Sequence, residues 1–115
     1  MARGALPLAF DVLLFYYAKT MQLTRRPDLI DALLALDSRA EAESFLADLC
    51  TPSEMKAFAE RWAIARMLDA GELSYREIAE ESGSSTATVV RVARFLKEMP
   101  YQGYRLILDR LKRRK

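Results

Sequence analysis

Three helix-start signatures constrain the fold of this chain more than any other feature. In a capping box, a Ser or Thr hydroxyl accepts a hydrogen bond from the third amide of a helix, and a Glu at that third position accepts one from the capping residue's amide. The sequence contains this pattern at Ser38 with Glu41, Thr51 with Glu54, and Ser74 with Glu77. The pattern predicts a chain of short, linked helices.

Glycine and proline indicate where these helices end. Gly71 and Gly83 follow apolar repeats of helical spacing, and glycine readily takes the left-handed conformation that closes a helix. Pro100 prevents the preceding helix from continuing. We therefore predict an all-α fold of about six helices. The helices identified from these signals are Pro27 to about Leu36, Ser38 to about Cys50, Thr51 to Asp69 or Ala70, Ser74 to Ser82, Ser84 or Ser85 to about Lys97, and a last one through Tyr104 and Leu111.

The length of 115 residues, with 51% hydrophobic content, allows one folding unit with one core. The apolar stretch from Ala5 to Ala18 is broken by Pro7 and Asp11, and it is shorter than the roughly 20 residues that a membrane span needs. No small-residue cleavage site of a signal peptide follows it. Two interpretations stay open: a helix whose apolar face needs a partner, or an extension upstream of a start at Met21.

Charge is distributed unevenly along the chain. Residues 1–90 carry nine Lys and Arg against 14 Asp and Glu, a net charge of −5, whereas residues 91–115 carry nine against two, a net charge of +7. A basic end suits a polyanionic partner, because binding phosphates releases counterions. A solvated basic tail is the alternative interpretation.

The absence of histidine and the single cysteine, Cys50, exclude several kinds of chemistry. Zinc sites built from Cys and His are excluded, and no imidazole is present to activate Ser84, Ser85 or Thr86 as a nucleophile. We therefore expect no enzyme activity, no cofactor and no metal. One cysteine that cannot form an intrachain disulfide suits the reducing cytoplasm.

Residues 75–95 have the pattern of a helix-turn-helix, in which the second helix enters the major groove of DNA. Inward-facing apolar positions are predicted on both helices, with Gly83 at the turn: Ile78 and Ala79 on the first helix, and Val89 and Val92 on the second. The remaining face carries short side chains near its start and arginines further along, which suits base edges and phosphates. The candidate DNA-binding residues are Arg76, Ser84, Ser85, Thr86, Ala87, Val90, Arg91 and Arg94.

The run from Thr51 to Pro100 resembles the Trp repressor superfamily, and within it the YerC/YecD-like branch. The residues that carry the resemblance are TPSE and ERWAIARMLDAGELSYREIAEESGSSTATVVRVARFLKEMP. The resemblance implies an intertwined homodimer that binds double-stranded DNA. On that basis residues 1–50 are assigned to dimerisation helices, with residues 1–20 as the uncertain extension, and residues 51–115 to the DNA-binding region with a basic C-terminal helix.

The resemblance also implies an effector pocket, and this sequence departs from its pattern. The positions that hold tryptophan in the Trp repressor match Thr51, Arg61, Thr88 and Arg91, which are chemically retained. Two small pocket residues of the family are replaced by Val92 and Phe95, whose added volume should fill the space for an indole. We therefore expect a DNA-binding transcriptional regulator, a repressor, that does not respond to tryptophan and whose effector is left open.

One alternative function is retained. The same sequence pattern can simply pack two helices against a core, without binding DNA. The chain would then be a protein-interaction module that docks another factor through its apolar N-terminal helices and basic tail.

Overall fold

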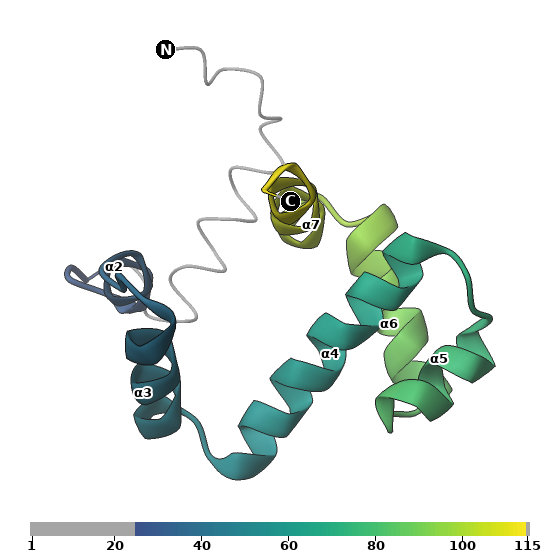
Figure 1. Cartoon of the computed structure of the whole chain (residues 1–115), viewed down its shortest axis with the longest axis horizontal. Helices are drawn as coiled ribbons and strands as arrows, with labels where there is room; N and C mark the ends of the chain where they lie inside the picture. The colour runs from purple at the N-terminus through teal and green to yellow at the C-terminus, as the bar shows by residue number, and fades with distance from the viewer. Residues whose placement is uncertain (1–24, 115) are drawn as a thin grey trace. The chain divides into compact units, whose positions relative to one another are not determined.

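The computed structural model describes residues 25–114, and every regular element in this range is an α-helix. The apolar stretch from Ala5 to Ala18 lies outside the described residues. Contacts divide the chain into two units, residues 1–49 and residues 50–115, rather than the one unit expected from its length. The helices, labelled in Figure 1, are α2 (Leu29–Leu34), α3 (Arg39–Leu49), α4 (Pro52–Ala70), α5 (Tyr75–Ser82), α6 (Thr86–Lys97) and α7 (Gly103–Arg113).

The helix α2 is shorter than predicted at both ends. Its N-cap is Asp28, which accepts a hydrogen bond from the Asp31 amide at 3.0 Å, while the Asp31 carboxylate accepts one from the Asp28 amide at 2.9 Å. Pro27 therefore precedes the cap instead of lying in the first turn. A hydrogen bond from Arg26 to Asp31, with the backbone bond from Asp28, lowers the pKa of Asp31 to about 2.

The helix α3 begins after Ser38 as predicted, but only half of its capping box forms. The Ser38 hydroxyl accepts the Glu41 amide at 3.1 Å, whereas the Glu41 carboxylate accepts the amide of Asp37, one residue earlier than expected. Neither α2 nor α3 contains a buried residue, and the Leu34 side chain is 80% exposed. These two helices alone therefore do not supply a core.

The predicted boundaries of α4 and α5 are confirmed. Thr51 with Glu54 and Ser74 with Glu77 each form both hydrogen bonds of a capping box. Gly71 and Gly83 close the two helices in the left-handed conformation, each with a φ of 72°. At this φ a side chain would be strained, so glycine is needed at both positions.

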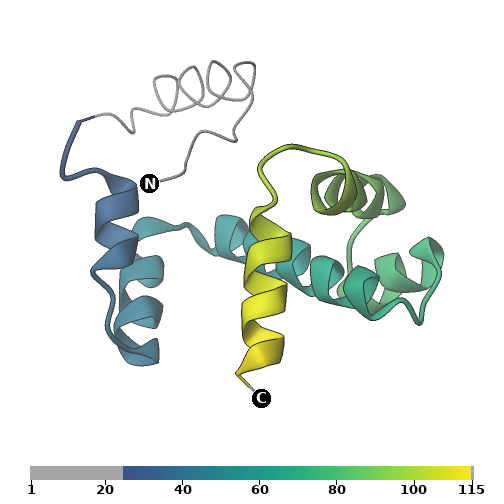
Figure 2. The same ribbon diagram turned by 90° about the horizontal axis from the view of Figure 1, so that it is seen from above.

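The second unit has its core where α4, α5, α6 and α7 meet. The helices α4, α5 and α6 pack against one another, and α7 packs against α4 and α6. Figure 2 shows α7 crossing α4. Trp62, predicted as a core residue, is only partly buried and packs against the edge of this cluster. The fully buried large side chains are Ile64, Ile78, Val89 and Val92.

Ion pairs tie α7 to the C-terminal end of α4. The Asp69 carboxylate lies 2.8 Å from the Lys112 Nζ and 2.8 Å from an Arg105 guanidinium nitrogen. Hydrogen bonds from Lys112 and then Arg105 lower the pKa of the Asp69 carboxyl, and the same contact raises the pKa of Arg105. The pairs therefore help to fix the angle at which α7 crosses α4.

We expect Asp69→Asn to destabilise the second unit by about 1 kcal/mol at pH 7, since Lys112 is largely exposed and water screens part of the attraction. Because the pKa of Asp69 is lowered on folding, the stabilisation is present above the unfolded pKa, near 4, and is lost as the pH falls through the folded pKa. Urea unfolding of both proteins at a series of pH values tests this, and the difference should shrink in acid. Glu43→Gln, which breaks the exposed pair with Arg39, should change little at any pH.

Candidate DNA interface

The turn between α5 and α6 is held by backbone hydrogen bonds. The Gly83 amide donates to the Glu80 carbonyl and the Ser84 amide to the Ala79 carbonyl, at 3.3 and 3.0 Å. Of the two predicted caps, Ser85 is the N-cap of α6: its Oγ accepts the Thr88 amide at 3.1 Å. The inward set is confirmed, because Ile78, Ala79, Val89 and Val92 are all buried.

The opposite face of α6 is open to solvent. Ser84 is half-buried in the turn, and Arg76 is exposed near the start of α5, on a different helix from the rest. The structure therefore brings seven of the eight candidate residues together along the turn and α6. We call the exposed face of α6, together with the turn before it, the reading face. Its exposed residues are Ser85, Thr86, Ala87, Val90, Arg91 and Arg94.

The charge on this face is uniformly positive. The helix α6 contains no acidic residue, and Arg94 and Lys97 lie in its last turn, where the helix dipole favours cations. Within residues 25–114, no carboxylate forms an ion pair with Arg91, Arg94 or Lys97. An anion that approaches α6 therefore meets arginines that have not already been neutralised.

The start of α6 also favours an anion. The first amides of any helix lack partners within it, and the positive end of the helix dipole lies there. The Glu60 carboxylate, which approaches Gly83 on the side where a Cβ would lie, is itself paired with Lys56. The Ser85 hydroxyl already contacts the Thr88 hydroxyl at 3.1 Å, so the cap orients both side chains.

Two of the six predicted effector-pocket residues are arginines whose guanidinium groups lie over aromatic rings of this chain. The Arg91 guanidinium lies 4.7 Å from the centroid of the Phe95 ring, and the Arg61 guanidinium lies 5.2 Å from that of Phe58. Val92 is fully buried. Both guanidinium groups therefore already have an aromatic partner within the chain.

The structure does not bring the six residues together in one cavity of this chain. Thr51, the N-cap of α4, and Arg61 are ten positions apart in the sequence, which corresponds to about 15 Å of helix. The hydroxyl of Thr51 caps α4, and that of Thr88 is bonded to Ser85. Thr51 and Arg61 of one chain are therefore set well apart along α4, at its N-cap and in its middle.

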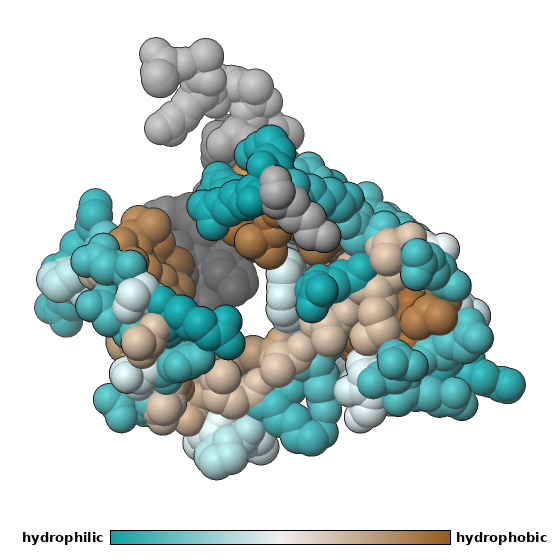
Figure 3. Space-filling model, in the orientation of Figure 1, coloured by the Kyte–Doolittle hydropathy of each residue, from teal (hydrophilic) through white to brown (hydrophobic). Residues whose placement is uncertain are grey.

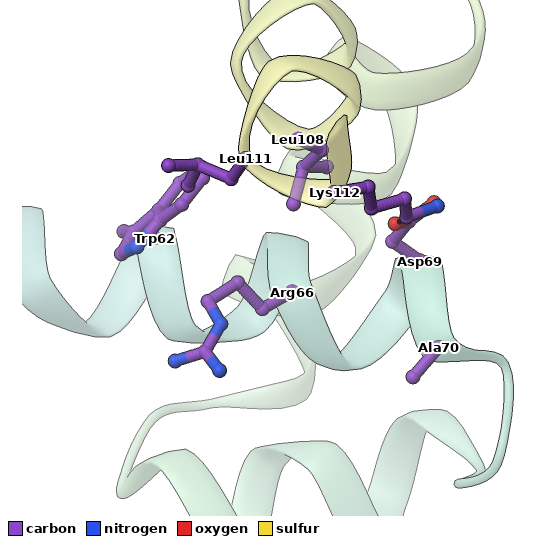
Figure 4. A pocket seen from close by; sticks show the side chains of 7 residues that line it. All are labelled: Trp62, Arg66, Asp69, Ala70, Leu108, Leu111 and Lys112. Carbon is purple, nitrogen blue, oxygen red and sulfur yellow. Dashed lines mark ion pairs between the residues drawn. The ribbon is translucent and has the colours of Figure 1, made fainter. Parts of the chain in front are cut away.

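A groove of about 470 Å³ lies elsewhere, between α4 and α7. Figure 4 shows Trp62 and Leu111 on one side of it, with Asp69 and Lys112 on the other. It shares no residue with the predicted effector pocket, and sequence reasoning missed it. The spacing of Trp62 and Leu108 predicted two apolar faces but not the gap between them. The lining residues are Trp62, Arg66, Asp69, Ala70, Leu108, Leu111 and Lys112.

Residues 25–114 contain neither a cluster of metal ligands nor a membrane-spanning helix. In this range no group of three or more Cys, Asp or Glu is arranged to hold a metal ion. No helix there is long and apolar enough to cross a bilayer.

The geometry defines a helix-turn-helix protein with an exposed, basic second helix. Residues 26–112 match the family model described as Trp repressor protein, and the chain belongs to the Trp repressor family.

Individual relatives agree with this assignment. The chain is 40% identical over 84 residues to the uncharacterised protein YerC of Bacillus subtilis (strain 168). The aligned region covers 73% of this chain and 79% of YerC. It is 43% identical over 75 residues to the Trp operon repressor homolog of Chlamydia trachomatis serovar D, covering 62% of this chain and 80% of that protein.

Solved structures show the same fold. A crystal structure of a TrpR-like protein from Eubacterium eligens superposes with a TM-score of 0.68 at 38% identity, covering 73% of this chain and 84% of that one. A second crystal structure, of a putative Trp repressor from Staphylococcus aureus, superposes with a TM-score of 0.67 at 40% identity. The match covers 73% of this chain and 82% of that one.

Proposed function

We propose that this protein is a sequence-specific DNA-binding transcriptional regulator, a repressor, whose reading head is residues 75–95. The observation that carries the proposal is the reading face of α6, which is exposed, positively charged and free of acidic residues. Short side chains at its start allow close approach to base edges, and Arg91 and Arg94 reach further. Membership of the Trp repressor family supports the same function.

We further propose that the protein acts as a homodimer. The N-terminal half of α4 and the groove beside α7 leave apolar side chains exposed, among them Phe58 (48%) and Leu111 (43%). Figure 3 shows apolar surface, tan to brown, along α4. Exposed apolar area of this kind is typical of an interface. A two-fold dimer would present two α6 helices to half-sites about one DNA turn apart.

A selection experiment tests the proposed function. Random duplexes are incubated with the full-length protein, and the retained fraction is amplified and selected again. We expect a pseudo-palindromic sequence to be enriched, and its affinity to fall steeply with salt because phosphate contacts release counterions. Failure to enrich any sequence would contradict the proposal.

The protein should not use tryptophan as an effector. Val92 and Phe95 replace two small pocket residues of the family, and their added volume should fill the space that an indole would need. The guanidinium groups of Arg91 and Arg61 already lie over aromatic rings of the chain. Isothermal titration calorimetry with L-tryptophan should show no binding in the micromolar range. The affinity for the selected duplex should be the same with and without tryptophan; a tryptophan-dependent affinity would overturn this prediction.

A protein-interaction module is the second candidate, and the exposed leucines of α2 favour it. Leu29, Leu33 and Leu34 are each at least 40% exposed. Such a module would form a stable complex with a different protein and would show no preference among DNA sequences. The selection experiment above therefore distinguishes the two candidates.

A further inference from the structure

The contact between Arg91 and Phe95 joins an exposed side chain of the reading face to a half-buried one. The two residues are one helical turn apart on α6, and the guanidinium lies 4.7 Å from the ring centroid. Because Phe95 is half-buried, its ring has less freedom than that of an exposed side chain. No carboxylate among residues 25–114 pairs with Arg91, so the Phe95 ring is the partner that orients its guanidinium.

We infer that Phe95 is a positioning residue for DNA recognition: its ring holds the Arg91 guanidinium in the orientation in which it meets a base. This inference rests on the proposed function. An arginine stacked through its flat face keeps its N–H donors, which lie in the plane of the guanidinium, available at the edge. A carboxylate partner would instead occupy those donors.

The energetic benefit is a smaller loss of freedom on binding. A free arginine side chain must give up much of its rotamer entropy when it forms a bidentate contact with guanine. A guanidinium already restrained by a ring has given up part of that entropy before it meets DNA. An exposed cation–π contact contributes about 0.5–1 kcal/mol, which corresponds to about 2–5-fold in affinity.

Arg94 provides the matched comparison on the same helix. It is exposed like Arg91, and within the described part of the chain no aromatic ring lies beneath its guanidinium. Replacing the Phe95 ring should therefore weaken recognition only when Arg91 is present, whether or not Arg94 is.

The test is a double-mutant cycle on the full-length protein. The probes are the duplex selected by the wild-type protein and a scrambled duplex of equal length. Phe95→Leu keeps much of the side-chain volume but removes the ring. It should lower the affinity for the selected duplex about 2–5-fold and leave the affinity for the scrambled duplex unchanged. The same loss should occur in an Arg94→Ala background and should vanish in an Arg91→Ala background. Phe95→Tyr should retain wild-type affinity.

A measurement on the free protein checks the contact itself. In the nuclear magnetic resonance spectrum, the Arg91 Nε–H proton should be shifted upfield by the ring current of Phe95, and Phe95→Leu should remove the shift. A merely structural role of Phe95 would not require that signal.

The outcomes separate the inference from the function on which it rests. If the wild-type protein enriches no duplex, the proposed function fails and the inference fails with it. If the wild type binds its duplex but Phe95→Leu binds equally or more tightly, only the inference is overturned. An equal loss in the Arg91→Ala background, or an Arg91 signal without an upfield shift, would also overturn it.

Discussion

Replacing Ile78 by alanine is expected to destabilise the second unit by about 2–5 kcal/mol. The side chain is fully buried where α5 packs against α4 and α6, so truncation removes apolar contacts and leaves a cavity that the surrounding helices fill only in part. A unit of this size has a total stability of about 5–15 kcal/mol, so the loss is a large fraction of it. Urea unfolding followed by circular dichroism measures the difference.

Glu80→Ala is the matched control for this variant, because Glu80 lies on the same helix and is exposed. Its free energy of unfolding should change little, by about 0.5 kcal/mol or less. Equal midpoints for Ile78→Ala and the wild type would show that α5 does not pack on α4 and α6 as described.

Arg91→Ala is expected to lower affinity for the selected duplex by about 5–150-fold. A bidentate contact between arginine and guanine discriminates against the wrong base by about 1–3 kcal/mol, which corresponds to that range. The exposed position of Arg91 on α6, without an ion-pair partner among residues 25–114, leaves its donors available for such a contact. Fluorescence anisotropy with the selected and the scrambled duplex measures both affinities.

The loss for Arg91→Ala should be much smaller on the scrambled duplex. Arg39→Ala removes the same charge from α3, at an exposed position outside the second unit, and should cost little on either duplex. Equal losses for Arg91→Ala on both duplexes would mean that this arginine contacts only phosphate.

The helix boundaries could be predicted where local chemistry decides them. Thr51, Ser74 and Gly83 act through hydrogen bonds and dihedral angles within a few residues, so their roles follow from spacing alone. The same logic applied to Asp28 and Asp31 would have placed the start of α2 correctly, but a carboxylate pair is a less familiar capping box than Ser with Glu. Pro27 suggested a start two residues too early.

The exposed and buried faces of α6 were also predictable, because they follow from a period of 3.6 residues. The stack of Arg91 on Phe95 was not foreseen, although the four-residue spacing is the signal that could have found it. By contrast, Asp69 and Arg105 are 36 residues apart, and their pairing depends on the angle at which α7 crosses α4. Such angles arise from the packing of whole helices, which no local pattern specifies.

The most direct test of the central claim, that the exposed face of α6 meets DNA, is a map of amide chemical shifts on the labelled full-length protein. The selected duplex is titrated into it, and the changes are assigned along the chain. We predict that the largest changes fall on the α5–α6 turn and on the reading face, from Ser84 to Arg94. Changes confined to α2, α3 or the end of α7, with α6 unaffected, would contradict the claim.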